Sequence, residues 1–114
     1  MSPTQRSLAK LRCDGWTVCI VEKWVPASAA GFKGRLITRD AFGFADLLAC
    51  KIGQPALLVQ TTTGSNAAAR VSKITATAEA GIWLAAGHRI IVHAWRKVGA
   101  CGKRKTWQCL EKII

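Results

Sequence analysis

The order of strand-like and helix-like segments is the feature that most restricts the fold of this chain. Five segments show the alternating or continuous apolar character typical of β-strands: 16–24, 42–50, 56–62, 88–98 and 105–114. An alanine-rich stretch at 67–86 interrupts them, and its composition predicts a helix that Thr75 and Thr77 divide into two pieces. Strands on both sides of a helical segment predict an α/β protein with a central mixed sheet.

The remaining segments complete this arrangement. A first helix is expected at 3–13, where Ser2 or Thr4 can act as the N-cap and Pro3 lies in the opening turn. Residues 25–41 show no periodicity and predict a long loop, while 51–55 predict the turn of a hairpin. The expected order is therefore α-β-β-β-α-β-β. A chain of 114 residues normally forms one domain, so 1–114 is read as a single unit.

Positive charge is concentrated toward the C-terminal end. The chain has 17 Lys and Arg residues against 6 Asp and Glu, a formal net charge of +11. No acidic residue lies between Glu79 and Glu111, although this interval contains six cations: Arg89, Arg96, Lys97, Lys103, Arg104 and Lys105. The last five predict a nucleic-acid-binding face at one strand end and the following turn. The alternative is a charge that serves only solubility.

Cysteine usage and hydropathy predict a reducing, cytoplasmic setting. The five cysteines are odd in number and show no CxxC spacing, which indicates neither a disulfide framework nor a zinc ribbon. The first residues lack the apolar core of a signal peptide, so none is expected. No apolar run approaches about 18 residues, and no segment combines a basic face with a long apolar one, so no membrane segment is expected either. His88 and His93 would face opposite sides of one strand, which argues against a metal site shared by these two residues.

Two polar positions interrupt the apolar hairpin. Asp46 occurs in the segment FADLL, and Gln60-Thr61-Thr62 ends the next strand. Residues two apart on a strand share a face, so Gln60 and Thr62 are expected to point together, with Asp46 beside them. In element order and in these positions the chain resembles the PD-(D/E)XK nucleases, including the archaeal-type Holliday junction resolvases.

This resemblance implies a restriction-endonuclease-like fold and a divalent metal site for Mg²⁺ or Mn²⁺. Asp46 would take the place of the metal-binding aspartate of the family, and Gln60 and Thr62 the places of its acid-x-Lys motif. Glu22, or else Asp40, would supply a second carboxylate. Lys73 or Arg70 on the following helix would supply the missing cation. The metal ligands are therefore expected to be Asp46, Glu22 and Gln60.

The implied activity is metal-dependent cleavage of DNA, branched DNA in particular, by a homodimer. One alternative is a protein of the same fold that binds nucleic acid without cutting it, because Gln60 and Thr62 depart from the family motif. Another is a protein that docks on an acidic protein surface. Asp46 and Gln60 also have a structural interpretation, as a paired turn aspartate and a buried amide.

Overall fold

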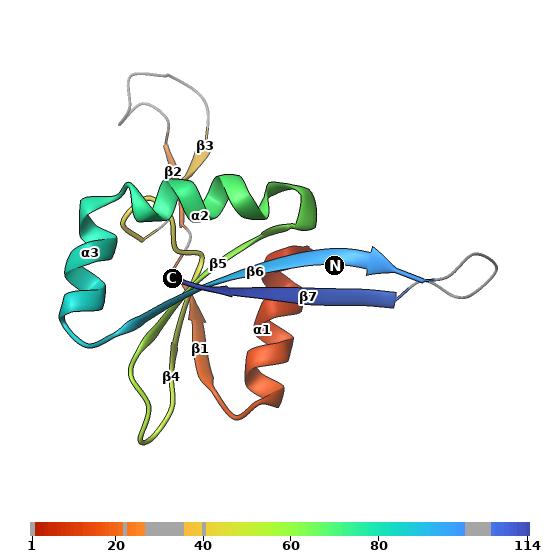
Figure 1. Cartoon of the computed structure of the whole chain (residues 1–114), viewed down its shortest axis with the longest axis horizontal. Helices are drawn as coiled ribbons and strands as arrows, with labels where there is room; N and C mark the ends of the chain where they lie inside the picture. Colours follow the sequence, from red (N-terminus) through yellow and green to blue (C-terminus); the bar gives the residue numbers. More distant parts are fainter. Residues whose placement is uncertain (1, 22, 27–35, 40, 100–105) are drawn as a thin grey trace.

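A five-stranded mixed sheet forms the centre of the computed structural model, which describes residues 2–21, 23–26, 36–39, 41–99 and 106–114 (Figure 1). In spatial order its strands are β1 (Thr17–Ile20), β4 (Leu47–Cys50), β5 (Leu57–Thr63), β6 (Arg89–Val98) and β7 (Thr106–Ile113). β5 and β6 are parallel, whereas the other neighbouring pairs are antiparallel. The chain is thus a single compact α/β domain, and the predicted mixed sheet is confirmed.

The parallel pair depends on a helical crossover between β5 and β6, which α2 (Ala67–Thr75) and α3 (Ala78–Ala85) provide. The predicted division of this helix is confirmed. The Thr75 hydroxyl donates to the Val71 and Ser72 carbonyls, and the Thr77 hydroxyl donates to the Lys73 carbonyl at 2.8 Å. The bond from Thr77 supplies a donor to a carbonyl at the end of α2, where the helix has no further amide to offer, whereas the Ser72 carbonyl also accepts the Ala76 amide.

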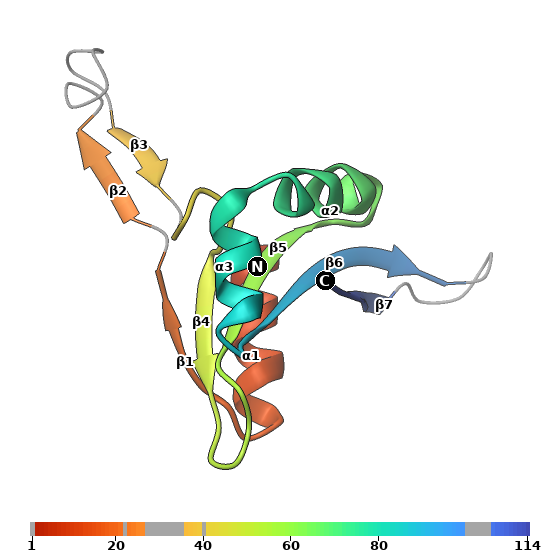
Figure 2. The same ribbon diagram turned by 60° about the vertical axis from the view of Figure 1, so that its left-hand side comes forward.

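Helices cover both faces of the sheet (Figure 2). On one face α1 (Pro3–Cys13) packs Leu8 and Leu11 against Val59 and neighbouring apolar side chains of the strands. On the other face Ile74 of α2 joins Leu58 and other buried residues of β5 and β6. Successive residues of β5 therefore face opposite layers, which explains why this strand is apolar on both sides. The predicted helix 3–13 is confirmed, with Ser2 as its N-cap.

The strand predicted at 16–24 is wrong, because the chain divides there into two separate strands. β1 ends at Ile20, and β2 (Lys23–Pro26) pairs with β3 (Leu36–Arg39) in a small antiparallel sheet of its own. This two-stranded unit projects from the main sheet (Figure 2). The loop predicted at 25–41 is also corrected, since it contains β3; residues 27–35 and 40 lie outside the described part.

The strand predicted at 42–50 is wrong in its first half. Phe42 and Gly43 have φ angles of 56° and 80°, and a bridge between Ala41 and Ala45 closes the turn around them. A strand cannot continue through left-handed backbone, so β4 begins only at Leu47. The hairpin between β4 and β5 is confirmed. No helix among the described residues is long and apolar enough to cross a membrane.

Candidate functional site

Asp46 lies buried at the entry to β4, only 6% exposed, with its carboxylate directed at β5. Its Oδ2 atom accepts hydrogen bonds from Gln60 Nε2 at 3.1 Å, from the Thr61 amide at 2.8 Å and from the Thr61 hydroxyl at 3.0 Å. The pairing of β4 with β5 positions Asp46, whose own amide donates to the Val59 carbonyl at 2.9 Å. The predicted meeting of Asp46 and Gln60 across the hairpin is confirmed.

The side-chain oxygen of Gln60 is buried and accepts no hydrogen bond from a described residue. The side chain is 3% exposed, and its Nε2 atom donates to Asp46 and to the Thr61 carbonyl. Both partners are acceptors, which fixes the orientation of the amide. The Oε1 atom is buried and accepts no hydrogen bond within the described part of the chain. Such an acceptor costs about 1–3 kcal/mol unless a donor or a cation reaches it. Thr62, on the same strand, is buried too.

The residues beside Asp46 offer Mg²⁺ a sparse set of ligands. They comprise one carboxylate and the unpartnered Gln60 oxygen, whereas Glu22 and Asp40 lie outside the described residues. Mg²⁺ is commonly held by one or two carboxylates, with waters and substrate phosphates completing its shell, so the set fits an ion that a phosphodiester helps to bind. The hydrogen bonds of Gln60 lead to Asp46 and to β5, not to Arg70 or Lys73 on α2.

A cationic and aromatic surface occupies the far end of the β6–β7 pair. Lys97 and Trp107 are direct cross-strand partners, and the Lys97 Nζ atom lies 5.3 Å from the centroid of the Trp107 ring. Arg6 of α1 stacks its guanidinium 3.9 Å from the same ring. Arg96 directly precedes Lys97 on β6 and donates to its cross-strand partner Gln108 at 3.3 Å. We use the name ribbon face for Arg6, Arg96, Lys97 and Trp107 together; Arg96 lies on the side of the β6–β7 pair opposite to the other three.

The cations of the ribbon face have no acidic partner in the described part of the chain. Ion pairs among the described residues join Lys10 to Asp14 and Glu111, with His93 near Glu111. Arg96 and Lys97, two of the residues predicted to bind nucleic acid, are exposed. The other predicted binding residues, Lys103, Arg104 and Lys105, lie outside the described residues.

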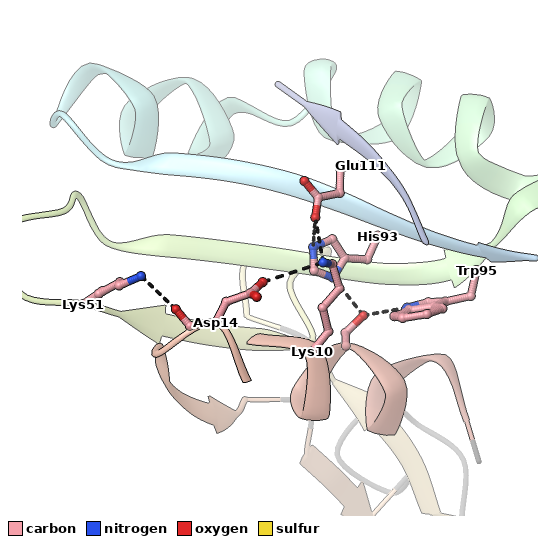
Figure 3. A network of polar contacts seen from close by, with 7 residues as sticks. Lys10, Asp14, Lys51, His93, Trp95 and Glu111 are labelled. Carbon is pink, nitrogen blue, oxygen red and sulfur yellow. Dashed lines mark hydrogen bonds and ion pairs between the residues drawn. The ribbon is translucent and has the colours of Figure 1, made fainter. Parts of the chain in front are cut away.

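A buried polar network connects α1 to β6 and β7 (Figure 3). Ser7 Oγ accepts a hydrogen bond from Trp95 Nε1 at 2.8 Å and lies 2.9 Å from His93 Nδ1. The other ring nitrogen of His93 lies 3.8 Å from the Glu111 carboxylate. Burial lowers the pKa of His93 to about 4 despite the opposing effect of Glu111, so the imidazole is neutral at pH 7.

Cys109 lies beside this network. Burial, together with the nearby Glu111 carboxylate, raises the pKa of the Cys109 thiol to about 11, so the free thiol is protonated at pH 7. One ligand atom from each of His93, Cys109 and Glu111 lies within 4.8 Å of the other two. This cluster was not predicted from the sequence, where His93 was paired only with His88. The spacing of Cys109 and Glu111, two apart on a strand, was the available indication.

The chain matches no family model, no curated protein and no solved structure. The resemblance to PD-(D/E)XK nucleases therefore stays a prediction.

Proposed function

We propose that this protein binds nucleic acid, with DNA as the partner, through the ribbon face. The observation that carries the proposal is Trp107, 41% exposed, with Arg6 and Lys97 against its ring. An exposed aromatic ring among cations provides a stacking surface for a base or sugar beside positive charges for the phosphates.

The geometry of the β6–β7 ribbon supports the same partner. Arg96 and Lys97 are consecutive in a strand and therefore point to opposite faces of the ribbon. A two-stranded ribbon fits the major groove of B-form DNA, where cations on both faces can reach the phosphates of both groove walls. The β6–β7 ribbon extends past the rest of the sheet, consistent with such an arm (Figure 1).

Replacement of Trp107 tests this assignment. Trp107→Ala should weaken binding to labelled DNA by about 1–3 kcal/mol, the usual contribution of one stacked base. Phe42→Ala is the matched control, because Phe42 is also an exposed aromatic residue, 52% exposed, but belongs to the turn at 41–45. Equal affinities for the two variants would exclude Trp107 from the interface.

We further propose that the protein cleaves phosphodiester bonds in branched DNA as a restriction-endonuclease-like, resolvase-like homodimer. The supporting observation is the buried pair of Asp46 and Gln60, whose unpartnered Oε1 suits a cation. Asp46 would bind Mg²⁺ or Mn²⁺, with Gln60 as a neutral ligand. When bound, the ion would supply Lewis-acid stabilisation of phosphoryl oxygens and activation of water. A dimer would match the two-fold symmetry of a DNA junction. The proposed setting is the cytoplasm of the producing cell.

Cleavage of a labelled four-way junction with Mg²⁺, with Mn²⁺ and with chelator separates the two candidate functions. A nuclease requires metal-dependent products that disappear in Asp46→Asn and persist in Asp14→Asn, a matched change at an exposed aspartate. Cleavage by Asp46→Asn at the wild-type level would exclude the site. Binding without cleavage by the wild-type protein would identify a nucleic-acid-binding protein that has lost the reaction.

A further inference from the structure

Three side chains with metal-binding atoms gather on the α1 side of the β6–β7 pair. His93 and Glu111 are direct cross-strand partners, and Cys109 lies two residues before Glu111 on β7. Side chains two apart on a strand share a face, so both β7 residues project beside His93. Their ligand atoms lie within 4.8 Å of one another, although 16 or more residues separate His93 from the other two in the sequence.

We propose that His93, Cys109 and Glu111 form a binding site for a transition-metal cation of the Zn²⁺ type. Imidazole nitrogen, thiolate sulfur and carboxylate oxygen are the three ligand types that Zn²⁺ takes in proteins, whereas Mg²⁺ prefers oxygen alone. The site is therefore chemically distinct from the one at Asp46, and the proposal does not rest on DNA binding or cleavage.

The histidine is already oriented for this role. Ser7, fully buried on α1, holds the Nδ1 side of the ring at 2.9 Å, and Trp95 donates to the same hydroxyl oxygen. In the tautomer whose Nδ1–H donates to Ser7, the lone pair of Nε2 is directed toward Glu111 and is available to a metal. A hydrogen bond of this kind to the second ring nitrogen is the usual support of a metal-binding histidine, because it fixes both tautomer and orientation.

Small movements would complete the coordination sphere. Tetrahedral bonds of 2.0–2.3 Å require ligand atoms roughly 3.3–3.8 Å apart, so separations of up to 4.8 Å must close by about 1 Å. Glu111 is 45% exposed at its side chain and has room to make this movement. Coordination would release the thiol proton of Cys109 to solvent, as metal binding to cysteine generally does.

A fourth position would remain for water or an outside ligand. His93 and Glu111 line a cavity of ≈ 580 Å³ whose other walls include Leu11, Ile91 and Ile113. Three protein ligands with one open position are typical of zinc sites that bind a further molecule, whereas purely structural sites are closed by four.

Lys10 is the main competitor for the same position. Its ammonium lies 3.5 Å from the Glu111 carboxylate and 3.6 Å from Asp14 (Figure 3). A metal cation would displace this ammonium from Glu111, and the partly exposed Lys10 can retain its pairing with Asp14. Removal of Lys10 should therefore strengthen metal binding, a result that a purely structural role of the cluster does not produce.

Titration with Co²⁺, a spectroscopic substitute for Zn²⁺, tests the site. The background is a protein in which Cys109 is the one remaining thiol, with serine at positions 13, 19, 50 and 101. One equivalent of Co²⁺ per chain should give a thiolate-to-cobalt charge-transfer band that Zn²⁺ abolishes. Cys109→Ser should remove the band, and Glu111→Gln should lower the affinity by at least about tenfold. Circular dichroism would verify that both variants fold.

Lys10→Ala should raise the Co²⁺ affinity, whereas Arg12→Ala, at an exposed cation on the same helix, should leave it unchanged. Absence of the charge-transfer band in the background protein would overturn the proposal. An unchanged affinity in Glu111→Gln or in Lys10→Ala would overturn the proposed arrangement of ligands.

Discussion

Replacement of Asp46 by Asn should destabilise the fold substantially, in addition to any effect on activity. The Oδ2 atom accepts three hydrogen bonds in a buried position, from Gln60 and from the amide and hydroxyl of Thr61. Bonds to a charged acceptor contribute about 1.5–3 kcal/mol and neutral ones about 0.5–1.5, so loss of the charge costs about 1 kcal/mol for each bond. The expected loss is about 3 kcal/mol, a large part of the 5–15 kcal/mol typical of a domain.

Urea unfolding followed by tryptophan fluorescence measures this loss. The midpoint should fall in Asp46→Asn, with an unchanged dependence of the free energy on urea concentration. Asp14→Asn, at an exposed pair with Lys10, should change stability by less than about 0.5 kcal/mol. Equal stabilities of the two variants would refute the hydrogen-bonding role of Asp46. Cleavage assays on Asp46→Asn must be run well below its unfolding midpoint, because unfolding would also abolish activity.

Three further predictions concern His93, Ser7 and the predicted basic turn. The folded-state pKa of His93, about 4, lies below its ordinary value of 6.5, so the unfolded chain binds the additional proton between these values. The contribution of the neutral His93 to stability is therefore complete above pH 6.5 and falls toward pH 4. In urea unfolding, the free energy of unfolding of the metal-free protein should fall by about 2 kcal/mol between pH 7 and pH 5. His93→Gln should abolish that dependence. Ser7→Ala should cost about 1–3 kcal/mol in the same assay, because Trp95 Nε1 loses its acceptor; a neutral result would contradict the network. The predicted basic turn contains Lys103, Arg104 and Lys105. Replacement of all three by alanine should flatten the slope of log DNA affinity against log salt concentration by about two to three units. An unchanged slope would exclude the turn from the interface.

Local features of the fold were predictable from the sequence because short-range chemistry determines them. The Ser2 cap, Pro3 in the first turn and the threonines at the end of α2 act within a few residues of their own positions. The turn at 41–45 was not predictable from the alternation of apolar residues, because its apolar residues have the pattern of a strand. In the structure Phe42 adopts left-handed backbone, which ends any strand there. The departure of β2 from the main sheet depends on its pairing with β3, which the pattern of either segment alone does not reveal.

The candidate sites also differ in how far apart in the sequence their residues lie, and only the local one was predictable. Asp46 and Gln60 belong to one tight hairpin, so the spacing of two strands was enough to predict their meeting. The cluster at His93 depends on the exact register of β6 with β7 and on Ser7, which is 86 residues distant in the sequence. Arg6 reaches Trp107 only because α1 packs on that face of the sheet.

The salt dependence of DNA affinity tests the central claim, that the ribbon face binds the phosphate backbone. For a labelled duplex, the logarithm of the association constant should fall linearly with the logarithm of salt concentration, by about 0.9 for each phosphate contact. The double variant Arg96→Ala, Lys97→Ala should bind more weakly, with a slope flatter by about one to two units. The control Arg12→Ala, Lys51→Ala removes the same charge from exposed positions outside the ribbon and should retain the wild-type slope. Absence of salt-dependent binding by the wild-type protein, or equal slopes for the two double variants, would contradict the account.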